Sequence, residues 1–132
     1  MPCYKTNRHS CYNINFHLVV VTRYRHKCIN EELFNRLSEI TYNIFEERNR
    51  CSITAINHGE DHLHILFESP PQVAPSVLIN SFKTVSSRLI RKEFADYLAP
   101  FYWKPVFWSR SYLLLSTGGA PIEIIKKYIE NQ

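Results

Sequence analysis

The sequence has few cysteines and no C-x-x-C pair. Its four cysteines lie far apart along the chain, at Cys3, Cys11, Cys28 and Cys51. Zinc ribbons and disulfide frameworks depend on closely or regularly spaced cysteines, so this spacing indicates neither of them. We interpret the cysteines as free thiols in a reducing cytosol.

The sequence also lacks long apolar segments. Its longest apolar run covers residues 18–21, far short of the roughly 20 residues that cross a membrane as a helix. The polar N-terminus has no apolar segment of the kind found in signal peptides. We therefore expect a cytoplasmic protein with no membrane partner. A G-x-x-x-x-G-K motif is absent too, so no nucleotide cofactor is expected.

No repeat, low-complexity segment or linker divides the chain, and its 132 residues suit a single domain that spans 1–132. Lys and Arg total 16 while Asp and Glu total 12, which gives a formal net charge of +4. This balance favours a polyanionic partner without demanding one.

Hydrophobic periodicity predicts the order strand, helix, strand, strand, helix, strand, helix. The first strand, 12–24, carries apolar side chains on both faces and is expected in the centre of a sheet. Asn30 is expected to cap the first helix, which runs to about residue 50, and Ser76 to cap the second. The remaining elements are predicted at 51–58, 62–68, 112–115 and, for the last helix, 121–132.

The simplest arrangement of the first six elements is a ferredoxin-like (RRM-like) α+β fold. In this fold two helices cover one face of an antiparallel sheet whose first and third strands are central. The other face of the sheet stays open. The seventh element, the C-terminal helix, would have to pack there.

The last twelve residues predict a helix that presents a tyrosine and a glutamine on one side. Pro121 suits the first helical turn. The apolar stripe of this helix consists of Ile122, Ile125 and Ile129. Tyr128 and Gln132 are four residues apart, so the phenol and the amide point to one neighbourhood. The alternative is a docking helix whose tyrosine belongs to the core.

Two histidines occupy alternate positions of the third predicted strand. Because residues two apart share a face, His62 and His64 are expected together on the open face of the sheet. Two neighbouring imidazoles form half of a metal site, and Gln132 is a candidate third ligand. Two surface histidines without a metal are the alternative. Asp61 either orients a histidine through a hydrogen bond or completes the preceding turn.

With these histidines and with motifs elsewhere in the chain, the sequence resembles the single-tyrosine HUH transposases of bacterial and archaeal insertion sequences, the IS200-like (TnpA) type. HUH denotes His, a hydrophobic residue and His, which His62, Leu63 and His64 match. The resemblance covers nearly the whole chain. Its other motifs are, in order, Ser81-Phe82-Lys83, Ser86-Ser87-Arg88, Arg91-Lys92-Glu93-Phe94, Phe107-Trp108-Ser109, Ser111-Tyr112, Gly118-Gly119-Ala120-Pro121 and the segment 127–132.

The resemblance implies a metal-dependent endonuclease and strand-transferase that acts on single-stranded DNA. By that match the metal, Mg²⁺ or Mn²⁺, would be bound by His62, His64 and Gln132, and Tyr128 would be the nucleophile. In this family the tyrosine retains the 5′-phosphate and releases a 3′-hydroxyl. The cation would favour the phenolate, and the nearby lysines 126 and 127 either help or are simply solvated.

The resemblance also implies hairpin DNA as the substrate and a homodimer with shared active sites. In the family two subunits join their sheets, and each tyrosine helix can complete the partner's histidine pair. Gly118-Gly119 would let the helix leave its own sheet, and a tight turn at these glycines is the alternative. Candidate phosphate contacts, for which a solvated surface is the alternative, are Arg23, Arg25, Lys27, Lys83, Arg88, Arg91 and Lys92.

Two other functions stay open on the sequence alone. A ferredoxin-like sheet with aromatic and basic side chains can bind unpaired bases without catalysis, and such a module would need neither Tyr128 nor a metal. A nickase with the same site, serving replication or the processing of repeat elements, would share the chemistry.

Overall fold

The computed structural model describes residues 5–6, 11–116 and 122–132. Its main sheet is antiparallel, with strands in the order β4-β5-β3-β6. In that order the strands are Ser52–His58, His62–Glu68, Asn15–Val21 and Leu113–Ser116. A separate two-stranded ribbon pairs β1 (Lys5–Thr6) with β2 (Cys11–Tyr12).

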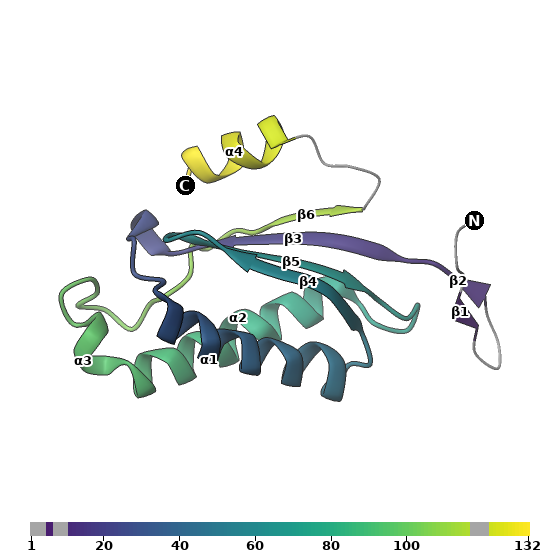
Figure 1. The fold of residues 1–132 in the computed structure, drawn as a ribbon, viewed down its shortest axis with the longest axis horizontal. Helices are drawn as coiled ribbons and strands as arrows, with labels where there is room; N and C mark the ends of the chain where they lie inside the picture. Colours follow the sequence, from purple (N-terminus) through teal and green to yellow (C-terminus); the bar gives the residue numbers. More distant parts are fainter. Residues whose placement is uncertain (1–4, 7–10, 117–121) are drawn as a thin grey trace.

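Helices lie on both faces of the main sheet (Figure 1). One face is covered by α1 (Glu31–Tyr42), which continues as a π-helical segment (Asn43–Arg48), and by α2 (Pro75–Glu93). A short helix, α3 (Ala95–Leu98), follows α2. The opposite face carries α4 (Ile122–Glu130). The predicted ferredoxin-like arrangement is confirmed, including the central position of the strands that are now β3 and β5.

The core lies between the sheet and the layer of α1 and α2. Along β5, Leu63, Ile65 and Phe67 are buried in the main hydrophobic cluster, and the residues between them are half-buried. On β3 all of residues 18–21 are fully buried, so this strand is covered on both faces. Burial on both faces fits a central strand with helices on either side of the sheet.

The first predicted strand is shorter than expected. In place of a strand over 12–24, β2 and β3 are separate, and β3 ends at Val21. The chain then enters a 3₁₀ turn, η1 (Arg23–Arg25). Tyr24 and Arg25 have φ angles of 61° and 55°, a left-handed backbone that cannot continue a strand. The basic cluster after β3 is therefore a tight turn.

The two predicted helix caps have different outcomes. Asn30 caps α1, with its side-chain oxygen accepting a hydrogen bond from the Leu33 amide at 2.8 Å. The prediction that Ser76 caps α2 is wrong, because the helix begins one residue earlier, at Pro75. The ring of a proline fixes φ at a helical value and suits the first helical position. Ala74 precedes it without a side-chain cap.

The described cysteines are free thiols, as predicted for them: Cys11 is exposed, while Cys28 and Cys51 are buried. Burial raises the pKa of Cys28 to about 11 and also raises the pKa of Cys51. Both buried thiols are therefore protonated and unreactive near neutral pH. Separately, over the described ranges the structure has no helix long and apolar enough to cross a membrane.

Candidate functional site

The strand β5 presents two histidines on the sheet face that carries α4. His62 and His64, which we call the histidine pair, are half-buried, whereas Leu63 between them is fully buried in the core. Their ring centroids are 4.8 Å apart, with the ring planes nearly perpendicular at 83°. The two imidazoles share one face because side chains alternate along a strand.

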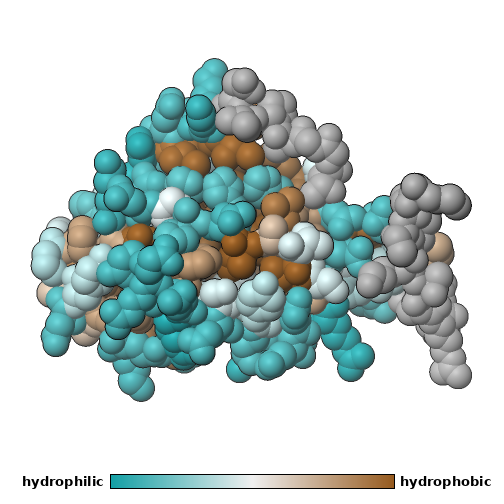
Figure 2. Space-filling view, viewed as in Figure 1, coloured by the Kyte–Doolittle hydropathy of each residue, from teal (hydrophilic) through white to brown (hydrophobic). Residues whose placement is uncertain are grey.

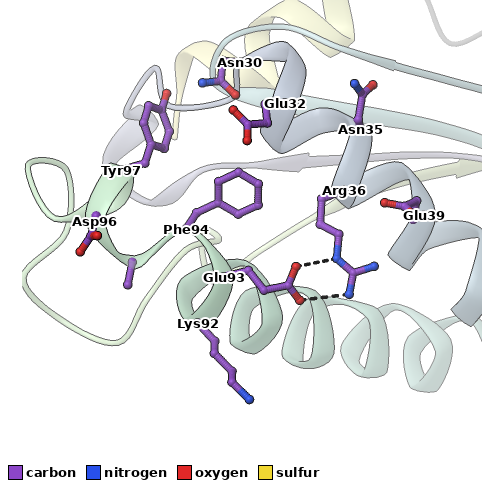
Figure 3. Close-up of a pocket in the computed structure, with 11 residues that line it drawn as sticks. Asn30, Glu32, Asn35, Arg36, Glu39, Lys92, Glu93, Phe94, Asp96 and Tyr97 are labelled. Carbon is purple, nitrogen blue, oxygen red and sulfur yellow. Dashed lines mark hydrogen bonds and ion pairs between the residues drawn. The ribbon is translucent and has the colours of Figure 1, made fainter.

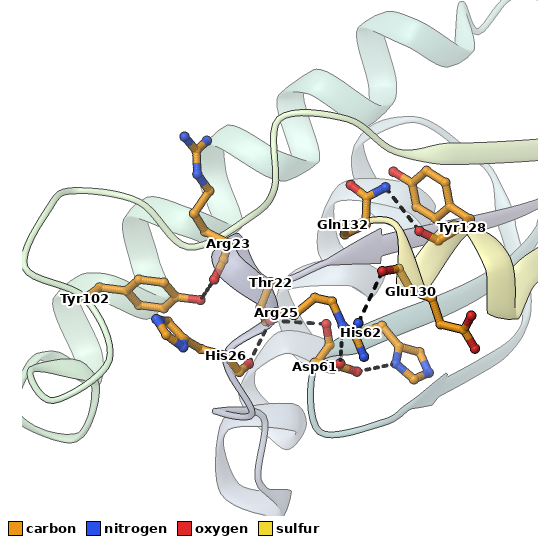
Figure 4. A network of polar contacts seen from close by, with 10 residues as sticks. All are labelled: Thr22, Arg23, Arg25, His26, Asp61, His62, Tyr102, Tyr128, Glu130 and Gln132. Atoms are coloured by element: carbon orange, nitrogen blue, oxygen red, sulfur yellow. Dashed lines mark hydrogen bonds and ion pairs between the residues drawn. The ribbon is translucent and has the colours of Figure 1, made fainter.

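Asp61 comes directly before the strand and contacts His62 (Figure 4). Its Oδ1 lies 2.7 Å from His62 Nδ1, and its Oδ2 accepts a hydrogen bond from Arg25 Nε at 3.4 Å. Burial alone would raise the pKa of Asp61. The hydrogen bond and charge of His62, and then those of Arg25, outweigh this effect, so the pKa of Asp61 lies below its ordinary value. When ionised Asp61 accepts a hydrogen bond from Nδ1–H of His62, the Nε2 atom of that ring carries the free lone pair. This contact is the one expected of an orienting carboxylate.

A third histidine contacts the pair from the neighbouring strand. His17 of β3 places its Nε2 3.1 Å from His64 Nδ1. Burial lowers the pKa of His64 to about 4, with the charges of His62 and His17 adding to the shift, and burial also lowers the pKa of His17. His64 is therefore neutral near pH 7, the form in which imidazole binds metals. Sequence reasoning left His17 out of the site, although alternation along its strand places it on the same face as Val19 and Val21.

The helix α4 brings Tyr128 and Gln132 to two serines that precede β6. Tyr128 Oη lies 2.7 Å from Ser111 Oγ. Gln132 Oε1 accepts hydrogen bonds from Ser109 Oγ at 2.9 Å and from Ser111 Oγ at 3.0 Å, and Gln132 Nε2 donates to the Tyr128 carbonyl at 3.1 Å. Burial raises the pKa of Tyr128, an effect that the Ser111 hydrogen bond opposes. The phenol and the amide thus share one neighbourhood, as their spacing predicts.

The side of α4 that faces the sheet is apolar. Ile125 and Ile129 are half-buried, and Figure 2 shows hydrophobic atoms gathered between α4 and the sheet. Ile122 lies in the helix, but its side chain is outside the described part of the structure. Lys126 and Lys127 are exposed, which agrees with the solvated alternative for these two lysines.

Lys83 of α2 donates hydrogen bonds to the backbone of the segment that contains the two serines, residues 109–111. Its Nζ donates to the carbonyl oxygens of Ser109, Arg110 and Ser111 at 2.7, 3.1 and 3.1 Å. These contacts use all three N–H donors of the ammonium group. Burial lowers the pKa of Lys83. A phosphate contact at Lys83 stays a prediction, but in this structure the charge is directed at the backbone that receives α4.

Arg25 links the histidine side of the site to the tyrosine helix (Figure 4). While its Nε faces Asp61, its Nη1 donates to the Glu130 carbonyl at 3.3 Å, at the C-terminal end of α4. A cation is favourable at that end of a helix. Across the described ranges, no hydrogen bond joins Tyr128 or Gln132 to the histidine pair. The two halves of the candidate site therefore share a face and are bridged by Arg25.

The other predicted phosphate contacts lie in three places. Just after the end of β3 are Arg23, Arg25 and Lys27, of which Arg25 contacts Asp61. On the side of α2 toward α1 are Arg88 and Lys92, which border hollows between the two helices. Arg91 borders other hollows, together with residues of the segment 98–110. Because α1 and α2 cover the face opposite α4, the residues between these helices lie away from the histidine pair.

The donor set fits a divalent cation when an amide oxygen completes it. Among the residues that the structure describes, no three His, Cys, Asp or Glu side chains group closely enough to hold a metal ion. The histidine pair offers two imidazoles whose Nδ1 atoms are engaged, which leaves both Nε2 atoms for a metal. Gln132 Oε1 would add an oxygen once it leaves the two serines. Mixed nitrogen and oxygen ligands suit Mn²⁺ better than Mg²⁺, which favours oxygen.

Sequence comparisons find transposases. The family model described as "Transposase IS200 like" matches residues 10–132. The chain is 28% identical over 128 residues to the ISDra2 transposase TnpA of Deinococcus radiodurans, across 97% of this chain and 90% of that protein. It is 29% identical over 128 residues to the transposase for insertion sequence element IS200 of Salmonella typhimurium, across 97% of this chain and 82% of that protein.

Two solved structures have a similar fold. A crystal structure of a candidate transposase from Deinococcus radiodurans R1 superposes with a TM-score of 0.86 at 27% identity, and the match covers 97% of both chains. A REP-associated tyrosine transposase bound to a REP hairpin superposes with a TM-score of 0.54 at 13% identity, across 96% of this chain and 68% of that chain. The second likeness shows the fold alone.

Proposed function

Since this chain belongs to the IS200-like transposase family, we propose that it cleaves and rejoins single-stranded DNA at insertion-sequence ends through a covalent 5′-phosphotyrosine. One observation carries the proposal: α4, with Tyr128 and Gln132, packs on the sheet face opposite α1 and α2 (Figure 1), and the histidine pair lies on that same face because Leu63 between its members is buried on the other. Family membership also favours an enzyme over the non-catalytic binding module.

In this proposal Tyr128 is the nucleophile. Its phenol oxygen attacks the phosphorus of the scissile phosphodiester, the bond from phosphorus to the 3′ oxygen breaks, and that oxygen takes up a proton. The 5′-phosphate stays on the tyrosine. Joining reverses the step, so one phosphodiester replaces another and no ATP is consumed. Because burial raises the pKa of Tyr128, attack needs a positive charge that favours the phenolate.

We assign His62, His64 and Gln132 as ligands of Mg²⁺ or Mn²⁺. The bound cation would polarise a non-bridging phosphate oxygen and offset the charge that develops during attack. The chain prepares its imidazoles in advance, because Asp61 contacts one ring at 2.7 Å and His17 contacts the other at 3.1 Å. The amide lies one helical turn after the phenol, so a shift of α4 that frees the amide also carries the phenol.

A covalent attachment assay tests the proposed function. The chain is incubated with a single-stranded oligonucleotide that carries an element end, and the products are separated under denaturing conditions. We expect a protein–DNA adduct with Mg²⁺ or Mn²⁺ and none with chelator. An adduct that forms equally well in chelator would contradict the assigned metal.

Binding is expected to require hairpins with single-stranded flanks and to weaken as salt rises. Each phosphate neutralised in a single strand contributes about −0.7 to the slope of log affinity against log salt. Contacts from Arg23, Arg25 and Lys27 would therefore give a slope near −2 (about −0.7 for each of the three). Fluorescence anisotropy at several salt concentrations measures the slope. Equal affinity for a hairpin and for a blunt duplex of the same length would refute the expected preference.

We further propose a homodimer in which the tyrosine helix of one subunit serves the histidine pair of the other. In the described ranges α4 packs on its own sheet and Tyr128 contacts its own Ser111, while the predicted hinge, Gly118-Gly119, lies outside them. Exchange would require α4 to leave these contacts.

Mixing a Tyr128→Phe chain with a His64→Ala chain is expected to restore roughly a quarter of wild-type cleavage. Half of the randomly mixed dimers carry both variants, and one of their two sites combines an intact tyrosine with intact histidines. Each variant alone should be inactive. Sedimentation checks that the mixture is dimeric. A dimeric mixture that stays inactive would rule out exchange, and a cleaving monomer would rule out the dimer.

A further inference from the structure

One of the two tryptophans is largely exposed on the surface. Trp103 is 85% exposed, the highest value among the exposed large hydrophobic side chains of the described residues. The second tryptophan, Trp108, is only 6% exposed and donates its indole N–H to Ser86 Oγ at 2.9 Å. Trp103 borders a hollow of about 230 Å³. An exposed indole beside a hollow is a surface on which a planar group can stack.

Trp103 and a second exposed ring, Tyr24, each have a cation over the ring. Lys104 Nζ lies 4.7 Å from the centroid of the Trp103 ring, and Arg23 Cζ lies 5.2 Å from that of Tyr24, which is 53% exposed. The side chain of Arg23 and the charge of Lys104 lower the pKa of Tyr24. Tyr102 Oη donates to the Arg23 carbonyl at 2.8 Å and fastens this part of the surface.

The hollow beside Trp103 shares lining residues with a second hollow. Arg91 and Pro105 line both, and the second hollow has a volume of about 330 Å³. The lining of the second hollow includes Ser109 and Arg110, and Ser109 is one of the two serines that hold Gln132. A basic surface therefore runs from the indole to the segment that receives α4.

Charge distinguishes this surface from a hollow between α1 and the end of α2. Neither of the two hollows near the indole has an Asp or Glu in its lining. The hollow in Figure 3, of about 560 Å³, contains four acidic side chains, Glu32, Glu39, Glu93 and Asp96. Its Arg36 is already paired with Glu93 through contacts of 2.7 and 3.0 Å. A polyanion is thus disfavoured there and favoured beside Trp103.

We propose that Trp103 stacks on an unpaired base of the single strand that flanks the active site, and that Lys104, Arg91 and Arg110 contact the phosphates of this strand. Aromatic stacking combined with a positively charged groove is the usual means of holding single strands. The inference rests on the proposed function, because it takes single-stranded DNA as the substrate. It adds a binding site for the flank, on the side of the molecule where α3 and the following loop lie.

The test uses Tyr128→Phe chains in chelator, so that binding is measured without cleavage. For a hairpin with a single-stranded flank, adding Trp103→Ala is expected to weaken affinity about tenfold, as loss of one base–aromatic stack does. Trp103→Phe should retain most of the affinity. The matched control is Val77→Ala, which removes another exposed apolar side chain (68% exposed) in the first turn of α2, and it should leave affinity unchanged.

Fluorescence gives a second, independent readout because the chain has only two tryptophans. The oligonucleotide should quench emission from the exposed Trp103, and this quenching should vanish in Trp103→Phe, where only the buried Trp108 emits. Unchanged affinity of Trp103→Ala, or quenching that persists in Trp103→Phe, would overturn the proposal. The proposal would also be overturned if Trp103→Ala lost the dimer but kept normal oligonucleotide affinity, because the surface would then bind a second copy of the chain. A chain that binds DNA through Trp103 but never forms an adduct would overturn the proposed function instead.

Discussion

Tyr128→Phe is expected to abolish covalent attachment to single-stranded DNA, by at least about 10⁴-fold, as removal of a catalytic nucleophile does. The substitution removes only the phenol oxygen, so the half-buried ring keeps its place on the sheet. The lost hydrogen bond to Ser111 should lower the free energy of unfolding by about 1 kcal/mol. Denaturing electrophoresis measures the adduct, and fluorescence anisotropy should show near-normal oligonucleotide affinity.

Two control variants separate this effect from local disturbance. Tyr42→Phe removes a phenol oxygen from a partly exposed tyrosine, 38% accessible, at the end of α1, and it should attach normally. Ser111→Ala removes the hydrogen-bond partner of Tyr128 but keeps the nucleophile, so attachment should persist, within about tenfold of wild type. Undiminished attachment by Tyr128→Phe would remove this residue from the mechanism.

His62→Ala and His64→Ala are each expected to suppress cleavage by about 10³-fold or more, because a metal supplies several kcal/mol of charge stabilisation. Each variant should also weaken Mn²⁺ binding, which electron paramagnetic resonance measures without any reaction. Mn²⁺ should replace Mg²⁺ in the wild-type chain, since two of the assigned ligands are nitrogens.

The matched control for the histidine pair is His58→Ala on the neighbouring strand β4. His58 contacts Glu31 and the Gly59 carbonyl and stacks on Phe34, so it belongs to the side of the molecule where α1 begins. Its loss should leave Mn²⁺ affinity near that of wild type. Full activity of either pair variant in chelator would defeat the metal assignment.

Features set by local spacing were predictable from the sequence. Strand alternation placed His62 and His64 on the face opposite Leu63, and the helical period placed Tyr128 one turn from Gln132. Both are found in the structure because they depend on neighbours along one element. The ferredoxin-like arrangement followed from the order and the apolar faces of the elements.

Contacts between distant segments were not predictable in the same way. The contact of His17 with His64 depends on the register of β3 against β5. Ser111 meets the tyrosine only because α4 packs back over the segment before β6. Lys83 was predicted as a phosphate contact. Its hydrogen bonds to three carbonyl oxygens of residues 109–111 could not be predicted, because those residues are distant from α2 in the sequence. Only the folded chain brings these groups together.

The proposed chemistry is tested most sharply by finding which residue becomes attached to DNA and by which end of the DNA. A wild-type chain incubated with an oligonucleotide and Mn²⁺ is digested with trypsin and analysed by mass spectrometry. We expect DNA on the peptide 128–132, which follows Lys127, joined through its 5′-phosphate, with the upstream fragment released as a 3′-hydroxyl. An adduct on another residue, or one joined through a 3′-phosphate, would contradict the account.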